Sequence, residues 1–313
     1  MFRRPEKTLN LILVHQPRKL SHTDFDAIAA KIVQIAPEIH IFGVLPTETV
    51  DVIPKAHWAR PTLTVSFGRV GRFVPLRGPI YENSSVPKLQ QFRSFLAHGL
   101  LTPHTDLYRS GMPLDPHQWG PFIILKPLDL AHTSNGKNLQ VFRTTALSGR
   151  RLPDDHPSHR MPMLVQSWID TGEQMSSYRC LTLFGALLYS MKLLRAEPRP
   201  SLGSPDHIIE AMPAESDRGN RTRNHDRTIW DFAAAMAGVF PRHPILGCDI
   251  IREEKTGKLY ALEVNAGGNV WHFSSASTER WRTYEKTHSL KVEFSSFETA
   301  AEVLVRKARL EAR

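Results

Sequence analysis

The stretch KLYALEVNAGGNVW, residues 258–271, carries an acid inside an otherwise apolar strand pattern. Residues 259–265 predict a strand, and successive side chains of a strand point to opposite faces. Glu263 and Asn265 therefore share one face, and a pair of glycines, Gly267 and Gly268, follows directly. The sequence thus places an acid and an amide side by side at the end of a strand.

A second acid lies on the preceding apolar run, ILGCDII at 245–251. The turn signal Lys255-Thr256-Gly257 separates the two runs and predicts a β-hairpin. If the turn centres near Thr256, Asp249 lies directly across from Glu263, and Asn265 shares their face. The opposite face is then a core surface made by Cys248, Ile250, Tyr260, Leu262 and Val264.

Two carboxylates and one amide oxygen on a rigid hairpin suit a hard cation, and Mg²⁺ bridging phosphate groups is the usual one. The alternative is an ordinary strand end whose acids pair with nearby lysines or arginines. A register shift of one residue would turn Asp249 to the other face and remove the cation site.

Composition sets the broad class of the protein. The chain has 313 residues, which is long for a single core and predicts two or three subdomains. A formal charge of +9 and a pI near 9.7 favour an anionic partner such as a nucleotide, an acidic substrate or a nucleic acid. Cys180 and Cys248, the two cysteines, lie in apolar runs and are expected to be buried free thiols of a reduced compartment. The N-terminal apolar stretch is too short for a signal peptide, and no run could span a bilayer, so we expect a soluble, cytoplasmic protein.

Periodicity predicts an α/β (α+β) chain. Apolar strands at 9–14, 39–44 and 62–66, with a helix at 22–36, favour a small parallel α/β layer, and no G-x-G-x-x-G accompanies it. Further elements are expected as helices at 87–98, 228–240 and from about 297, and as strands at 121–126, 138–142, 163–169, 178–184 and 187–194. The corresponding domains are 1–85, 86–162 and 163–313.

The pattern of an Asp, a short hairpin and then Glu-x-Asn, read as CDII…LYALEVNAGG, resembles the metal-binding signature of the ATP-grasp superfamily. The resemblance extends in order over about residues 80–275. It implies an ATP-grasp fold of two α+β subdomains, preceded by a small parallel α/β domain over 1–85. It also implies ATP and Mg²⁺ as cofactors, with two Mg²⁺ ions, or Mn²⁺ in their place.

The resemblance further assigns nucleotide contacts. Lys126 ends the strand PFIILKP and is similar to the lysine that contacts phosphates in this family, and Lys88 is similar to an earlier lysine that reaches the nucleotide. The simple alternative for both is a solvated surface lysine. The loop 131–137, with Ser134 and Gly136, stands where the family has its phosphate-covering loop, although it holds only one glycine.

The segment MLVQSWIDTGEQ, residues 163–174, resembles the hinge that holds adenine in the family. The resemblance implies that the backbone around Gln166, Trp168 and Ile169 faces the base, that the Trp168 ring itself is core, and that Glu173 accepts hydrogen bonds from the ribose.

The resemblance also implies that basic residues on the next strands contact the transferred phosphate or an acidic substrate. In this sequence they are Arg179, Lys192 and Arg195. Ligases that join two D-alanines carry an arginine two residues before the metal-binding aspartate. Here that position is Gly247, so another cation is needed, and D-alanine ligation is not the expected reaction.

Other motifs favour no competing mechanism. The sequence has no Walker A motif and no G-x-S-x-G nucleophile elbow. The arginines of DRGNRTRNHDR, residues 217–227, are compatible with a nucleic-acid contact, a clamp for an acidic substrate or a solvated loop.

The sequence therefore predicts an ATP-dependent ligase that activates a carboxylate as an acyl-phosphate and joins it to an amine or thiol. Its expected partners are ATP and small acidic or amino-acid-like substrates; a membrane or nucleic-acid partner is not expected, and a homodimer stays open. Two alternatives remain, an ATP-grasp kinase acting on a small-molecule hydroxyl and a non-enzymatic basic protein that binds nucleotide or nucleic acid.

Overall fold

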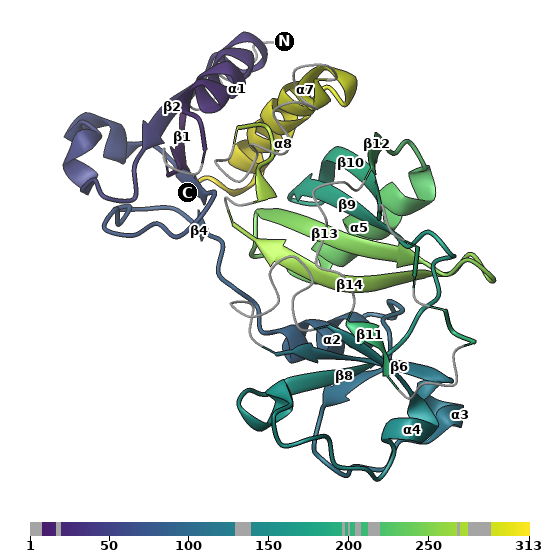
Figure 1. Ribbon diagram of the computed structural model, residues 1–313. Coiled ribbons are helices and arrows are strands. Elements are labelled where there is room, and N and C mark those ends of the chain that lie inside the picture. Colours follow the sequence, from purple (N-terminus) through teal and green to yellow (C-terminus); the bar gives the residue numbers. More distant parts are fainter. Residues whose placement is uncertain are drawn as a thin grey trace.

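The structure is a computed structural model that describes residues 8–16, 20–128, 139–195, 198–199, 201–203, 208–211, 220–267, 270–274 and 289–313. Three sheets form the framework of the described chain, and they follow one another along an elongated molecule (Figure 1). The mixture of sheets and helices confirms the predicted α/β (α+β) class.

The N-terminal sheet has the strand order β2-β1-β3-β4 and is parallel throughout. Its strands are β1 (Leu9–Val14), β2 (Ile39–Val44), β3 (Thr62–Ser66) and β4 (Ile80–Tyr81). Helix α1 (His22–Ile35) connects β1 to β2, and two 3₁₀ turns, Val50–Val52 and Lys55–Ala59, precede β3. This confirms the predicted parallel layer, and the near-continuous burial of β1 and β3 explains its uninterrupted apolar pattern.

The small sheet is antiparallel, with the order β11-β7-β6-β8-β5. Its strands are β5 (Thr105–Leu107), β6 (Phe122–Pro127), β7 (Gln140–Arg143), β8 (Met163–Ser167) and β11 (Ile208–Ala211). The helices of this region are α2 (Lys88–Ala97), α3 (Pro116–Trp119) and α4 (Thr144–Leu147), and a 3₁₀ turn spans Pro157–His159. Strand β8 was expected to open the C-terminal subdomain, but it pairs with β6 and β5, because its apolar residues complete the core of this sheet.

The large sheet is also antiparallel, with the order β12-β10-β9-β13-β14. Its strands are β9 (Ser176–Leu183), β10 (Ala186–Leu194), β12 (Asn220–Arg223), β13 (Ile245–Arg252) and β14 (Leu259–Ala266). Helix α5 (Arg227–Gly238) covers one face, and its start is capped by Asp226, whose carboxylate accepts from the Thr228 N–H at 2.9 Å.

The C-terminal helices join two of the sheets. Helices α7 (Leu290–Glu293) and α8 (Ser296–Glu311) lie between the N-terminal layer and the large sheet, and α8 contacts α1, β1, β3 and β10 (Figure 1). One buried cluster accordingly runs from the N-terminal sheet through Trp271 and Phe297 to Leu181 and Met191 on β9 and β10. The N-terminal layer and the large sheet therefore share one continuous core.

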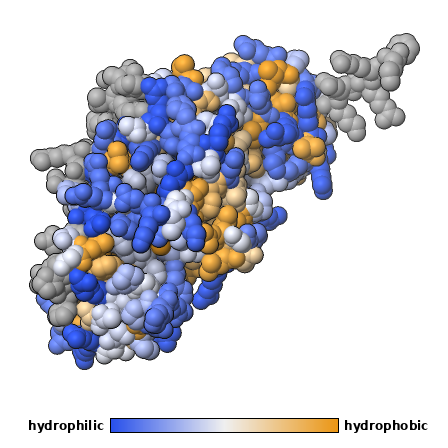
Figure 2. Space-filling view, turned by 90° about the vertical axis from the view of Figure 1, so that its right-hand side faces the viewer, coloured by the Kyte–Doolittle hydropathy of each residue, from blue (hydrophilic) through white to orange (hydrophobic). Residues whose placement is uncertain are grey.

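The surface is mainly hydrophilic on the face shown in Figure 2, with hydrophobic residues gathered in separate patches. In the described parts of the chain, we find no helix with the length and apolar character needed to cross a membrane.

Candidate active site

The β13–β14 hairpin places the two predicted acids opposite each other. Asp249 pairs with Glu263 across the two strands, as the turn signal predicts. A bulge follows directly, so that Ile250 pairs with Ala261 rather than with Leu262. The predicted core face is therefore wrong at Tyr260 and Leu262, and Ala261 takes their place in the buried cluster beside Cys248, Ile250 and Val264.

Side-chain contacts gather the three predicted metal ligands. The Asn265 amide nitrogen donates to Asp249 Oδ2 at 2.9 Å and approaches Glu263 Oε1 at 3.4 Å. Arg179, which pairs with Asp249 from β9, donates to the same carboxylate through Nε and through Nη2, the latter at 2.9 Å. Burial lowers the pKa of Arg179, but the charge and hydrogen bonds of Asp249 outweigh it, so the pKa is raised and the guanidinium stays charged.

This donor set fits Mg²⁺ that is shared with a substrate. The described residues contain no cluster of three or more His, Cys, Asp or Glu side chains that could hold a metal by themselves. Mg²⁺ commonly takes one or two carboxylates from the protein and completes its octahedron with phosphate oxygens and water. The Glu263 side chain is 28% exposed and can offer its oxygens in this way, while a rotated Asn265 amide would present its oxygen instead of its nitrogen.

Two lysines lie near Glu263. Lys88, the first residue of α2, is only 5% exposed, and its Nζ lies 4.0 Å from Glu263 Oε2. Lys126 on β6 is half-buried and donates from Nζ to Gln166 Oε1 at 2.9 Å. Burial lowers the pKa of Lys126 to about 8, a shift that Glu263 opposes and Lys88 reinforces. The lysines named from the resemblance thus converge on the hairpin, between the small and the large sheet.

A buried glutamine holds α2 against the hairpin. The Gln91 side chain accepts from the Val264 N–H at 2.7 Å and donates to the Val264 carbonyl at 3.1 Å. Thr102 adds a hydrogen bond to the Ala261 carbonyl at 2.9 Å. These contacts occupy backbone groups of the edge strand β14 and fix Lys88, three residues before Gln91, beside Glu263. Sequence reasoning missed Gln91, whose only signal is a polar residue among the apolar positions of α2.

The charges of the site favour an anion. Arg179, Lys88 and Lys126 supply three positive charges when protonated, against two negative charges on Asp249 and Glu263. A polyanion with a divalent cation balances such a group better than a neutral ligand does.

The predicted hinge is corrected in part. The Ser167 N–H donates to the His104 carbonyl at 2.8 Å, and the Trp168 N–H donates to the Phe122 carbonyl at 2.9 Å. These two backbone donors were expected to face adenine, but they are used within the protein. Gln166 is buried, and its amide bridges Lys126 and Thr105. The Trp168 side chain packs in a small apolar cluster, as predicted, and Ile169 follows just beyond β8.

Other predicted residues lie further away. Lys192 pairs with Tyr178, which belongs to the core under α5, so Lys192 lies on the face of the sheet opposite to Asp249. Arg195 follows the end of β10. It lies four residues beyond Met191, the residue that pairs with Arg179, and four residues span about 13 Å along a strand. Glu173 is exposed in the loop after β8. Ser134 and Gly136 lie outside the described residues.

Gly247 is needed by the segment that follows the hairpin. A Cβ at this position would lie 2.7 Å from Val270 Cγ1, so Val270 covers the position that carries arginine in the D-alanine ligases. Tyr189 fixes the segment by donating to the Val270 carbonyl at 2.9 Å. His272 is buried two residues later, and burial, followed by the charges of Arg179 and Arg221, lowers its pKa to about 3. His272 is therefore a neutral neighbour of Arg179, which sequence reasoning did not identify.

The arginine-rich segment 217–227 is partly engaged with the protein itself. Arg223 pairs with Glu293, and the Arg227 guanidinium lies 4.2 Å from the centre of the Trp230 ring. These contacts favour a structural role for both arginines over a nucleic-acid contact.

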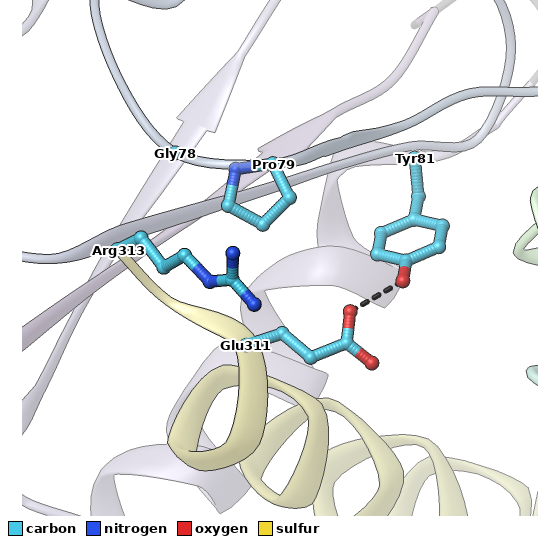
Figure 3. A pocket seen from close by; sticks show the side chains of 5 residues that line it. All are labelled: Gly78, Pro79, Tyr81, Glu311 and Arg313. Carbon is cyan, nitrogen blue, oxygen red and sulfur yellow. Dashed lines mark hydrogen bonds between the residues drawn. The ribbon is translucent and has the colours of Figure 1, made fainter.

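A cavity of the described chain lies away from these residues. It measures about 540 Å³ and is lined by Gly78, Pro79, Tyr81, Glu311 and Arg313 (Figure 3). The Glu311 carboxylate in its wall is already hydrogen-bonded within the protein. Tyr81 donates to it, and Lys307 donates to it at 2.7 Å. None of the residues that converge on Glu263 lines it, so we do not assign it to the site.

Comparisons with known proteins agree with this architecture. No family model and no curated protein sequence matches the chain. Among solved structures, the ATP-grasp ligase PsnB with precursor peptide PsnA2 and AMPPNP matches with 14% identity over 96% of this chain and 98% of that chain, at a TM-score of 0.50. PsnB with a phosphomimetic variant of its minimal precursor, Mg and ADP matches with 13% identity over 97% and 99%, also at 0.50. D-alanine–D-alanine ligase from Bacillus anthracis matches with 12% identity over 96% and 99%, at a TM-score of 0.44. The matches to PsnB span nearly both full chains, and this chain has the ATP-grasp fold.

Proposed function

We propose that the chain is an ATP-dependent ligase that converts a carboxylate into an acyl-phosphate and joins it to an amine or thiol nucleophile. The observation that carries this proposal is the convergence of Lys88 and Lys126 on Glu263, beside Asp249 and Asn265. The ATP-grasp ligases of the same fold support the reaction class. We place the protein in the cytoplasm, in keeping with two buried free thiols.

Asp249, Glu263 and Asn265 would hold magnesium, as one or two ions. When bound there, Mg²⁺ would supply the positive charge that neutralises the phosphates during transfer. Asn265 and Arg179 orient Asp249 through the hydrogen bonds described above, so this carboxylate is fixed before any ligand arrives.

Lys88 and Lys126 would bind the phosphate groups of ATP. Lys126 is half-buried, and at such a position an ammonium acts on a phosphate more strongly than it does in water, because less solvent screens the interaction. Gln166 holds the ammonium in place by accepting its hydrogen bond. Arg179 is the cation that we assign to the transferred phosphoryl group, in place of the arginine absent at Gly247.

The remaining nucleotide contacts stay as proposed from the resemblance. The chain beyond β8 around Ile169 would contact adenine, Glu173 the ribose, and the loop with Ser134 and Gly136 the phosphates. No side-chain nucleophile is required, since phosphoryl transfer depends mainly on positioning and charge neutralisation.

A carboxylate library with hydroxylamine as a general nucleophile tests this reaction. A ligase should form ADP, phosphate and a hydroxamate in equal amounts. If the carboxylate is labelled with ¹⁸O, one labelled oxygen should appear in the released phosphate. A kinase would leave a phosphorylated product without free phosphate, and a non-enzymatic protein would not turn over ATP. Asp249→Asn should abolish the reaction, whereas Asp231→Asn, on an exposed position of α5, should not change it.

A further inference from the structure

One face of helix α2 carries four buried side chains. They are Lys88, Gln91, Phe92 and Phe95, and their spacing of three and four residues places them on the same side of the helix. The helix lies between β14 and the small sheet, and it contacts β14 and β5 (Figure 1). Lys88 and Gln91 meet the hairpin, as described above. The two phenylalanines of this face have different surroundings.

Phe92 contacts the lysine of the small sheet. Phe92 is 3% exposed, and the Lys126 Nζ lies over its ring, 5.2 Å from the ring centre. An ammonium within about 6 Å of an aromatic centre is attracted by the negative face of the ring. This attraction is stronger where water is excluded, and here the ring is buried and the lysine is half-buried. The Phe92 ring therefore stabilises the charged form of Lys126.

The ring acts against the effect of burial on the same ammonium. Burial lowers the pKa of Lys126, Glu263 on β14 raises it, and Lys88 on α2 lowers it further. A carboxylate that keeps a lysine charged also repels phosphate, whereas an aromatic ring keeps it charged without adding a negative charge. An aromatic contact thus suits a lysine whose partner is to be a phosphate.

The ring also leaves the hydrogen-bond donors of the ammonium for other partners. A lysine ammonium has three N–H donors, and Lys126 gives one of them to Gln166 Oε1 at 2.9 Å. The attraction between an ammonium and a ring face is electrostatic and requires no acceptor lone pair. Gln166 and Phe92 together fix the position of the ammonium, and its remaining donors can meet phosphate oxygens.

We infer that Phe92 is a positioning residue for the nucleotide, and that the face of its ring holds the Lys126 ammonium charged and in place for the phosphates. This role rests on the proposed function, which supplies the phosphates. The contact between the ring and the ammonium is present without them.

Fluorination of the ring tests this role with little change of shape. Fluorine withdraws electrons from the ring face and weakens its attraction for a cation. With trifluorophenylalanine in place of Phe92, AMPPNP and Mg²⁺ should bind about threefold to tenfold more weakly at about pH 8.5, and the loss should be smaller at about pH 7. The reason is that a weaker contact lowers the pKa of Lys126, so that less of the ammonium is charged at the higher pH. A monofluorinated ring should have an intermediate effect, and the urea midpoint of unfolding should stay close to that of the wild type.

Phe92→Leu and Phe95→Leu form a matched pair of variants. Phe95 is completely buried in the apolar cluster under α5, and its ring meets Phe240 edge-on with 5.5 Å between the ring centres. Both variants lose a buried ring and should unfold at lower urea concentrations. Only Phe92→Leu should move the fall of AMPPNP affinity to a lower pH.

A Lys126→Gln background shows whether the effect passes through the lysine. Fluorination of Phe92 should not change the residual AMPPNP affinity of Lys126→Gln, because no ammonium then faces the ring. Equal affinities of the trifluorinated and wild-type proteins at both pH values would overturn the inference. An undiminished effect of fluorine in the Lys126→Gln background, or a pH shift in Phe95→Leu as large as that in Phe92→Leu, would overturn it as well.

The wild-type titration separates this inference from the proposed function. Failure of the wild type to bind AMPPNP with Mg²⁺ would refute the proposed function, and the role of Phe92 with it. Normal binding by the wild type, together with no response to fluorination, would refute only the role of Phe92.

Discussion

Lys126 is the residue whose surroundings say most about the site. Its half-buried side chain donates to Gln166 and lies near both Glu263 and Lys88, and partial burial lowers its pKa from 10.5 to about 8. The folded protein therefore binds fewer protons than the unfolded chain between about pH 8 and pH 10.5. Burial of this charge destabilises the fold in full below about pH 8, and that cost disappears as the pH rises through this window. A bound anion would offset this cost by stabilising the protonated ammonium.

The pH dependence of ATP binding follows from this shift. A triphosphate favours the protonated form of Lys126, so we expect ATP affinity in the presence of Mg²⁺ to fall as the pH rises above about 8. Lys126→Arg should lose most of this dependence, because a guanidinium stays charged up to about pH 12. Calorimetric titrations between about pH 7 and pH 9.5 measure it. A wild-type affinity that does not change over that range would contradict the phosphate role.

At the scale of elements, the contact between α2 and β14 positions the site. Gln91 bonds both backbone groups of Val264, and Lys88 begins the same helix. The register of the hairpin brings Asp249 to Glu263, and the helix brings a lysine to the same carboxylate. Neither element forms the site without the other.

Gln91→Met should therefore weaken both stability and nucleotide binding. Two buried backbone groups of Val264 would lose their partners, which costs about 2 kcal/mol of unfolding free energy. Urea denaturation measures this change, and ATP affinity should fall as well, because α2 no longer fixes Lys88. Gln90→Met, at an exposed position of the same helix, is the control and should alter neither quantity. Equal stability of the Gln91 and Gln90 variants would show that the contact is not needed.

Prediction from sequence worked where local rules decide. Alternation and one turn signal were enough to pair Asp249 with Glu263, and apolar runs were enough for the parallel strands of the N-terminal layer. The face on which Lys192 lies follows from its pairing with Tyr178, and this pairing cannot be read from the sequence around Lys192. Gln91 and His272 could not be assigned, because Gln91 bonds Val264, which is 173 residues away, and the charges that act on His272, Arg179 and Arg221, lie in other strands.

At the scale of the whole molecule, a buried acid ties the N-terminal layer to the C-terminal part of the chain. Asp24, in the first turn of α1, is 1% exposed. Its carboxylate accepts from Trp271 Nε1 at 2.9 Å, from Lys291 Nζ at 2.8 Å and from the Ser274 hydroxyl. The segment after the hairpin, with Val270 and His272, is thus held from both sides of the shared core.

Asp24→Ala should destabilise the protein by about 3–5 kcal/mol, because it leaves a lysine and two other donors without their acceptor. Asp26→Ala is the control, since the Asp26 side chain is 64% exposed, and it should change stability by less than about 0.5 kcal/mol. Denaturant unfolding of both variants gives the comparison. A change for Asp24→Ala as small as that of the control would show that the two parts of the chain are stable independently.

The central claim is that the hairpin acids and the two lysines hold a magnesium–nucleotide complex, and calorimetric titration with AMPPNP tests it most directly. The wild type should bind AMPPNP at least about tenfold more tightly with Mg²⁺ than without it, and Glu263→Gln should remove most of this difference. Equal affinity of the wild type with and without Mg²⁺, or a magnesium effect that persists unchanged in Glu263→Gln, would contradict the account.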